Sequence, residues 1–219
     1  MKVGVFAGTF IDTKMGADLL EANGYEAISF PLSKNPKEQT QMQYYSREEL
    51  GNIVLEKARQ GMKEGVEKIF IYCNSLSSAI DYEKIQEELG IPVITPLETY
   101  KKLPEGMKNI AIVAANGISA YGIDQMITAS DEEIQTLTFG NLPVVLDIEE
   151  GKSPQKILEE LNLYGWLDYL EGIQDPRYKI HGIVLGCTHF PYIKEELEKA
   201  TNIPFIDPTE DMLKRLRAE

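Results

Sequence analysis

The sequence has few cysteines and no long apolar run. Two cysteines occur among 219 residues, without a CxxC pair or a Cys/His ladder. This count excludes a disulfide framework, and the spacing argues against structural zinc. No apolar stretch approaches the roughly 18 residues of a membrane span, and the opening residues 1–10 are too short and strand-like for a signal peptide. We therefore expect a cytoplasmic protein whose two thiols are free.

Positive charge is also scarce. The chain has 22 Lys and Arg against 35 Asp and Glu, a formal net charge of −13. Because phosphate is bound largely by basic side chains, this balance argues against a nucleic-acid partner. An anionic substrate would need local stabilisation, which backbone N–H groups at helix N-termini can supply.

Short β-branched runs alternate with amphipathic stretches, which predicts an α/β protein whose mainly parallel sheets are flanked by helices. Ser46 and Glu49 form a capping-box signature at the start of one helix, and Pro191 occupies an early position of another. Residues 30–45 (FPLSKNPKEQTQMQYY) show no clear period, so we expect a long functional loop there. The predicted strands are Lys2–Phe6, Lys68–Tyr72, Ile91–Ile94, Asn109–Ala114, Ile183–Leu185 and Pro204–Ile206.

An internal repeat divides the chain. FIYCNS (Phe70–Ser75) parallels VLGCTH (Val184–His189), and the repeats continue into IPVITPLE and IPFIDPTE. The stretches that open the two halves, KVGVFA and NIAIVA, also match. Three matches in the same order predict two similar lobes with the active site in the cleft between them. We assign residues 1–95 plus 205–219 to the N-terminal α/β lobe and residues 96–204 to the C-terminal one.

Cys73 and Cys187 occupy equivalent places in this repeat, directly after predicted strands. Ligands of open α/β sheets bind beyond the carboxyl ends of the strands. Asn74–Ser75 and Thr188–His189 follow at once and offer small polar groups and backbone N–H groups. A single cysteine at a strand end is more often a buried packing residue. Two matched thiols facing each other instead suit proton removal from one face of a carbon and proton addition to the other.

At these residues the sequence resembles the aspartate/glutamate racemase superfamily, whose members use two cysteines and no pyridoxal phosphate. LGCTHFP (Leu185–Pro191) resembles the LGCTHYP motif of glutamate racemases, and YCNSLSSA (Tyr72–Ala79) is similar to the first-cysteine motif ACNTASA. Residues 147–151 (DIEEG) resemble a VExG segment whose glutamate, here Glu149, lies near the second cysteine. The resemblance implies a racemase of aspartate or glutamate that uses two-base 1,1-proton transfer without a cofactor or metal, and a homodimer.

The resemblance also implies roles for single residues. Cys73 would act on the D-enantiomer and Cys187 on the L-enantiomer, with His189 and Glu149 assisting Cys187 in catalysis. The plainer interpretation of His189, and of Asn74 and Ser75, is helix capping. A looser match over residues 113–127 (VAANGISAYGIDQMI) predicts polar substrate contacts. The expected substrate-binding residues are Asn74, Ser75, Thr188, Asn116, Ser119, Asp12 and Thr13.

The start of the chain departs from the glutamate racemase pattern. The family has an Asp-Ser pair directly after the first strand, whereas this chain has Phe6–Thr9, so we assign that role to Asp12 and Thr13 after a short insertion. Residues 30–45 replace the family's Pro-Tyr-Gly substrate loop, and we expect them to select the substrate. Gly16–Leu20 resembles the opening helix of aspartate racemases instead. These motifs favour racemase chemistry without choosing the amino acid.

Two alternatives stay open at this point. The first is another enzyme of the superfamily, such as a hydantoin racemase, decarboxylase or cis–trans isomerase. Several of these keep one catalytic cysteine, so the matched pair argues against them. The second is a non-catalytic protein that binds an amino acid, an alternative that the altered first loop keeps open. Exchange of the α-proton of a bound amino acid with solvent would distinguish an enzyme from a binding protein.

Overall fold

The computed structural model describes residues 1–34 and 36–218, which form two compact units. The first unit comprises Met1–Glu98 and the segment from Thr209 onward, and the second comprises Thr99–Pro208. The chain returns to the first unit at Thr209, later than the predicted residue 205. The reason is that β8 (Phe205–Ile206) pairs with β7 (Gly182–Gly186) of the second unit. In the described part of the chain, none of the helices combines the length and the apolar character that a membrane crossing requires.

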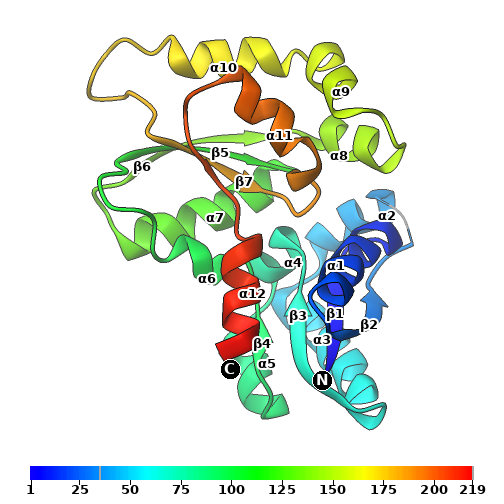
Figure 1. The fold of residues 1–219 in the computed structure, drawn as a ribbon. Helices are drawn as coiled ribbons and strands as arrows, with labels where there is room; N and C mark the ends of the chain where they lie inside the picture. Colours follow the sequence, from blue (N-terminus) through cyan, green and yellow to red (C-terminus); the bar gives the residue numbers. More distant parts are fainter. Residues whose placement is uncertain (35, 219) are drawn as a thin grey trace. The chain divides into compact units, whose positions relative to one another are not determined.

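The first unit has a parallel four-stranded sheet in the order β2-β1-β3-β4 (Figure 1). Side chains on one face of the sheet pack against α1 and α12, and those on the other pack against α3, α4 and α5. Both faces are therefore covered, which explains the continuous apolar sequences of β1 and β3. The elements are β1 (Lys2–Ala7), α1 (Phe10–Ala22), β2 (Glu26–Pro31), α2 (Pro36–Gln41), the 3-10 helix η1 (Met42–Tyr44), α3 (Arg47–Lys63), β3 (Val66–Ile71), α4 (Asn74–Ala79), α5 (Tyr82–Leu89), β4 (Val93–Ile94) and α12 (Thr209–Ala218), with α6 (Leu97–Tyr100) at the boundary.

The second unit repeats this topology with a parallel sheet in the order β6-β5-β7-β8. Helices α8 to α11 pack on one face of the sheet, and α7 lies against β5, β6 and β7 on the other. The predicted α/β architecture of two similar lobes is confirmed. The elements are β5 (Asn109–Ala114), α7 (Gly117–Ser130), β6 (Gln135–Gly140), α8 (Leu142–Glu149), α9 (Pro154–Glu160), α10 (Leu163–Glu171), β7, α11 (Pro191–Ala200) and β8.

Local sequence signals located several elements correctly. The capping box is present, because the Glu49 backbone N–H donates to the Ser46 hydroxyl while the Glu49 carboxylate accepts from the Ser46 backbone N–H. Pro191 is the first residue of α11, as predicted. Strands β2 and β6 were missed. They are outer strands with several solvent-exposed side chains, so the sequences EAISFP and QTLTFG lack a continuous apolar run.

The prediction of a long loop at residues 30–45 was wrong for most of its length. The segment contains the end of β2, helix α2 and the 3-10 helix η1. Proline at the first position of a helix has a compatible φ, and Pro36 begins α2 in this way. The helix is short and shows little apolar periodicity, which hid it in the sequence. Asn35, also part of the predicted loop, lies outside the described residues.

Candidate active site

The second unit places Cys187 directly after β7, one of the two inner strands of its sheet. Residues 187–190 form a turn, and α11 begins at Pro191. Gly186 allows this strand end to approach α7 closely, since a Cβ atom there would lie 2.5 Å from Ile123 Cδ1 and 3.0 Å from the Val113 carbonyl oxygen. The turn is well packed, with Cys187 only 8% exposed and His189 2% exposed. Cys187 therefore lies at the carboxyl edge of the sheet, where open α/β folds bind ligands.

His189 connects Cys187 to Glu149. Its Nδ1 atom lies 3.5 Å from the Cys187 sulfur, and its Nε2 atom lies 3.1 Å from Glu149 Oε1, at the end of α8. The carboxylate can accept the Nε2 proton, which leaves Nδ1 to accept a proton from the thiol. When both nitrogens carry protons, the same imidazolium donates to a thiolate. The structure thus brings together the three residues that the sequence predicted for this half of the site.

The other predicted residues of this unit share the same sheet edge. Thr188, the residue between Cys187 and His189 in the sequence, is buried. Asn116 follows β5, the neighbour of β7, and is the N-cap of α7. Its Oδ1 accepts hydrogen bonds from the Ser119 backbone N–H at 2.9 Å and from the Ser119 hydroxyl at 3.0 Å. Asn116 and Ser119 therefore organise the first turn of α7, and substrate binding by them stays a prediction.

The first unit places Cys73 in the equivalent position, after β3 and at the N-cap of α4. Cys73 is only 3% exposed. Its carbonyl oxygen accepts hydrogen bonds from the Ser77 N–H and hydroxyl at 3.0 and 2.8 Å. The sulfur lies 3.5 Å from the Ser75 hydroxyl and 3.9 Å from Gln39 Nε2. Asn74, the next residue, is also buried.

Asp12 and Thr13 are buried in the first turn of α1, which follows β1. Because β1 and β3 are adjacent parallel strands, Asp12 and Cys73 both come after the carboxyl ends of strands at the same end of the sheet. Asp12 Oδ2 accepts a hydrogen bond from the Gly8 backbone N–H at 3.3 Å. The Thr13 hydroxyl donates to the Thr9 carbonyl oxygen at 2.6 Å, inside the helix. Both side chains therefore take part in the hydrogen bonding of this first turn, and ligand contact by Asp12 and Thr13 stays a prediction.

Three residues at this edge were not singled out from the sequence. Thr9 is the N-cap of α1, since its hydroxyl accepts from the Asp12 backbone N–H at 3.2 Å. Its spacing to Asp12 is a capping signature that could have been recognised. The Ser33 N–H and hydroxyl both donate to the Gly8 carbonyl oxygen, at 2.8 and 2.6 Å. Gln39 carries no such sequence signal, because its position depends on tertiary packing.

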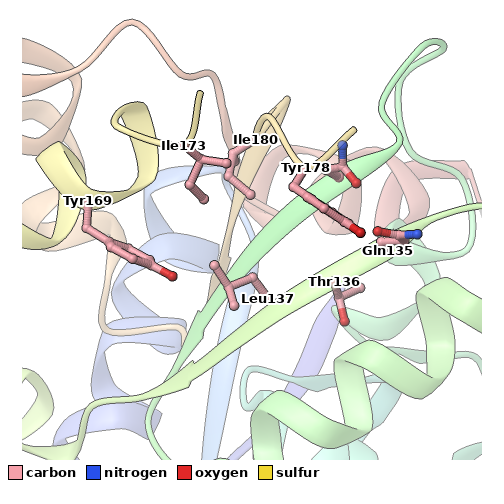
Figure 2. Close-up of a pocket in the computed structure, with 8 residues that line it drawn as sticks. Gln135, Thr136, Leu137, Tyr169, Ile173, Tyr178 and Ile180 are labelled. Carbon is pink, nitrogen blue, oxygen red and sulfur yellow. The ribbon is translucent and has the colours of Figure 1, made fainter. Parts of the chain in front are cut away.

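A separate pocket of about 330 Å³ lies at the amino-terminal ends of the strands of the second sheet, opposite the end that carries Cys187. Asn109 and Gln135, which line it, are the first residues of β5 and β6. In the view of Figure 2, apolar side chains lie between the rings of Tyr169 and Tyr178. Cys187 follows the carboxyl end of β7, so this pocket and the thiol occupy different ends of the unit.

Comparisons with known sequences agree with the motifs. A family model described as Asp/Glu/Hydantoin racemase matches residues 29–215. The glutamate racemase of Fusobacterium nucleatum is 27% identical over 159 residues, covering 70% of this chain and 57% of that protein. A glutamate racemase of Campylobacter concisus is 24% identical over 181 residues, covering 80% and 66%. The matched part of the chain thus spans roughly three fifths of the length of these relatives.

Solved structures share the fold. The glutamate racemase of Francisella tularensis, in complex with D-glutamate, aligns with a TM-score of 0.73 at 23% identity over 99% of this chain and 80% of that one. An aspartate racemase homologue from Pyrococcus horikoshii aligns with a TM-score of 0.65 at 16% identity, covering 99% and 97%. The allantoin racemase of Klebsiella pneumoniae gives 0.63 at 18% identity, covering 100% and 86%.

Proposed function

The chain belongs to the Asp/Glu/Hydantoin racemase family, and we propose that it racemises an acidic amino acid, aspartate or glutamate, without a cofactor. The similarity to the glutamate racemases of Fusobacterium nucleatum and Campylobacter concisus supports this reaction class. The proposed mechanism is a two-base 1,1-proton transfer in which one cysteine removes the α-proton and the other returns a proton to the opposite face. It requires both thiols to reach the same α-carbon in the working enzyme.

The observation that carries the proposal is the hydrogen-bonded arrangement of Cys187, His189 and Glu149. A buried thiol used only for packing has no need of an imidazole whose far nitrogen meets a carboxylate. Such an arrangement can pass a proton to and from sulfur near neutral pH. Cys73, after the matching strand of the other unit, supplies the second acid/base group.

Binding of the amino acid is proposed to use groups from both units. Backbone N–H groups and the polar side chains of Asn74, Ser75 and Thr188 would hold the α-carboxylate. Asn116 and Ser119 would add polar contacts, and the buried carboxylate of Asp12 has the charge to bind the ammonium group. Hydrogen bonds to the carboxylate stabilise the negative charge that develops when the α-proton leaves. This stabilisation matters because the α-proton of an amino acid is a very weak acid.

The proton transfers balance without a co-reactant. With the D-enantiomer, the Cys73 thiolate takes the α-proton and becomes a thiol, and the electron pair of the C–H bond is delocalised into the carboxylate. The Cys187 thiol then donates its proton to the opposite face and becomes a thiolate. His189 stabilises that thiolate, and Glu149 keeps the imidazole oriented. The L-enantiomer follows the same path in reverse.

Proton NMR in D₂O tests this function. The purified protein is incubated separately with L- and D-aspartate and with L- and D-glutamate. Loss of the α-proton signal, together with formation of the other enantiomer on a chiral column, is the expected result for one of the two amino acids. A Cys73→Ser/Cys187→Ser double variant is the control. Absence of α-exchange with all four compounds would refute the proposal and favour a binding protein.

A second candidate substrate is a hydantoin. The family description includes hydantoin racemases, and inversion of a hydantoin ring carbon needs the same pair of opposed bases. A chiral 5-substituted hydantoin added to the same NMR series separates the candidates. Exchange at its ring carbon without exchange of aspartate or glutamate would replace the amino acid as the proposed substrate.

We further propose that the protein works as a cytoplasmic homodimer. The family resemblance supports the dimer, and the free cysteines suit a reducing compartment. Light scattering at micromolar concentration tests the dimer, and localisation of a tagged chain by cell fractionation tests the compartment.

A further inference from the structure

Gln39 reaches the sulfur of Cys73 from a distant part of the sequence. Its Nε2 atom lies 3.9 Å from Cys73 Sγ, although 34 positions separate the two residues. Gln39 belongs to α2, which follows β2, whereas Cys73 follows β3. Since β1 lies between those two strands in the sheet, the side chain spans the end of β1 to reach the thiol.

Gly8, just after β1, makes this approach possible. A Cβ atom on Gly8 would lie 1.9 Å from Gln39 Nε2 and 2.3 Å from its Cδ, so the amide packs directly on the glycine backbone. Gly8 is itself held on both sides. Its N–H donates to Asp12 Oδ2, and its carbonyl oxygen accepts from the Ser33 N–H and hydroxyl. The glutamine amide is thus supported by a fixed piece of backbone.

We infer that Gln39 is a positioning residue for Cys73, whose amide N–H donates to the sulfur and favours the thiolate. This inference rests on the proposed function for its catalytic consequence but not for the contact itself. A thiolate accepts hydrogen bonds more strongly than a thiol, so a fixed donor stabilises the charged form. The amide is uncharged throughout the working pH range, in contrast to the imidazole of His189 beside Cys187.

Alkylation of Cys73 tests the contact independently of racemisation. The measurement uses iodoacetamide at pH 7.5 on full-length Cys187→Ser protein, with modification at Cys73 followed by mass spectrometry. Gln39→Leu keeps the side-chain size and removes the donor. Since the thiolate is the reactive form, we expect alkylation to slow severalfold. Asp12, the buried carboxylate that bonds to Gly8 at this strand edge, is common to all variants and does not bias the comparison.

Gln41→Leu on the same helix is the matched control, because Gln41 is exposed. Cys73 of this variant should be alkylated at the parent rate. Gln39→Glu provides a second test with similar shape, and its negative charge should slow alkylation further. If Gln39 only shields the thiol, Gln39→Leu will alkylate at the parent rate or faster, and that result overturns the inference. Thermal melting of each variant identifies loss of folding, in which case the Gln39→Glu result decides.

Kinetic isotope effects test the catalytic consequence on the otherwise unmodified enzyme. Racemisation has an equilibrium constant of one, so Gln39→Leu must lower kcat/KM equally in both directions, by roughly tenfold. The proton transfer at Cys73 then becomes more rate-limiting. In Gln39→Leu, the kinetic isotope effect of α-deuteration on kcat/KM should therefore be larger than in the parent for the D-enantiomer and smaller for the L-enantiomer. Unchanged isotope effects would contradict the inference, whereas an inactive parent enzyme would refute only the proposed function.

Discussion

The imidazole of His189 lies 3.5 Å from the sulfur of Cys187, and both side chains are buried in one tight turn. At Cys73, by contrast, the neighbouring groups include the hydroxyl of Ser75 and the amide of Gln39, which are neutral. The two thiols therefore lie at equivalent strand ends of the repeat but have different chemical surroundings. In the proposed reaction this difference allows each thiol to be adjusted separately for its own proton transfer.

Glu149 should matter for catalysis through His189. In Glu149→Gln, the amide oxygen can still accept a hydrogen bond from His189 Nε2, but it carries no negative charge, so it stabilises an imidazolium beside the Cys187 thiolate less well. We expect kcat to fall roughly a hundredfold, within the usual range for acid/base assistance, while the melting temperature changes little. Glu150→Gln is the matched control, because the neighbouring side chain is exposed. Equal activities of the two variants would exclude the role proposed for Glu149.

The two cysteines should be separable by one-sided exchange. Cys73→Ser and Cys187→Ser should each abolish racemisation, because protonation of the opposite face is lost. Each variant should nevertheless exchange the α-proton of one enantiomer slowly with D₂O, since one thiol remains. The measurement is NMR of the separate L- and D-compounds. Racemisation at the parent rate in either variant would contradict a two-base mechanism.

Gly186 should be essential for the packing of the second unit. In Gly186→Ala the new methyl group would lie 2.5 Å from Ile123 Cδ1 and 3.0 Å from the Val113 carbonyl oxygen, so the Ile123 side chain must move away and the contact with β5 becomes tight. We expect a loss of about 1–3 kcal/mol in the free energy of unfolding, measured by urea denaturation. Gly117→Ala, where a Cβ meets nothing within 4 Å, should leave stability unchanged or slightly raised. Equal midpoints for the two variants would show that the close approach is not needed.

The capping box of α3 should contribute to acid sensitivity. Hydrogen bonds from the Ser46 backbone and hydroxyl lower the pKa of Glu49 from its ordinary value of 4.5. Because the folded-state pKa is depressed, the stabilisation is fully present above about pH 4.5 and is lost as the pH falls through the lowered value. Glu49→Gln should therefore lose stability relative to the parent at pH 6 but approach it at pH 3. Urea midpoints between pH 3 and 6 check this, with Glu48→Gln as the control.

Local sequence determined much of the architecture. Buried central strands require continuous apolar runs, so β1, β3, β5 and β7 could be recognised within one or two residues. The helix starts at Ser46 and Pro191 follow from local hydrogen bonding and a fixed φ, and both were predictable. The repeat placed Cys73 and Cys187 at equivalent strand ends, because the two halves have the same order of elements and each cysteine follows the third strand of its half.

Only the tertiary structure decided what surrounds each thiol. Glu149 and His189 are 40 positions apart and meet because α8 ends beside the turn after β7. Gln39 reaches Cys73 because Gly8 leaves space and because the order of the strands brings the end of β1 between them. Outer strands β2 and β6 were missed because partial exposure removes the apolar signal. The sequence determines where the two thiols lie along each sheet, whereas packing between distant segments determines which groups act on them.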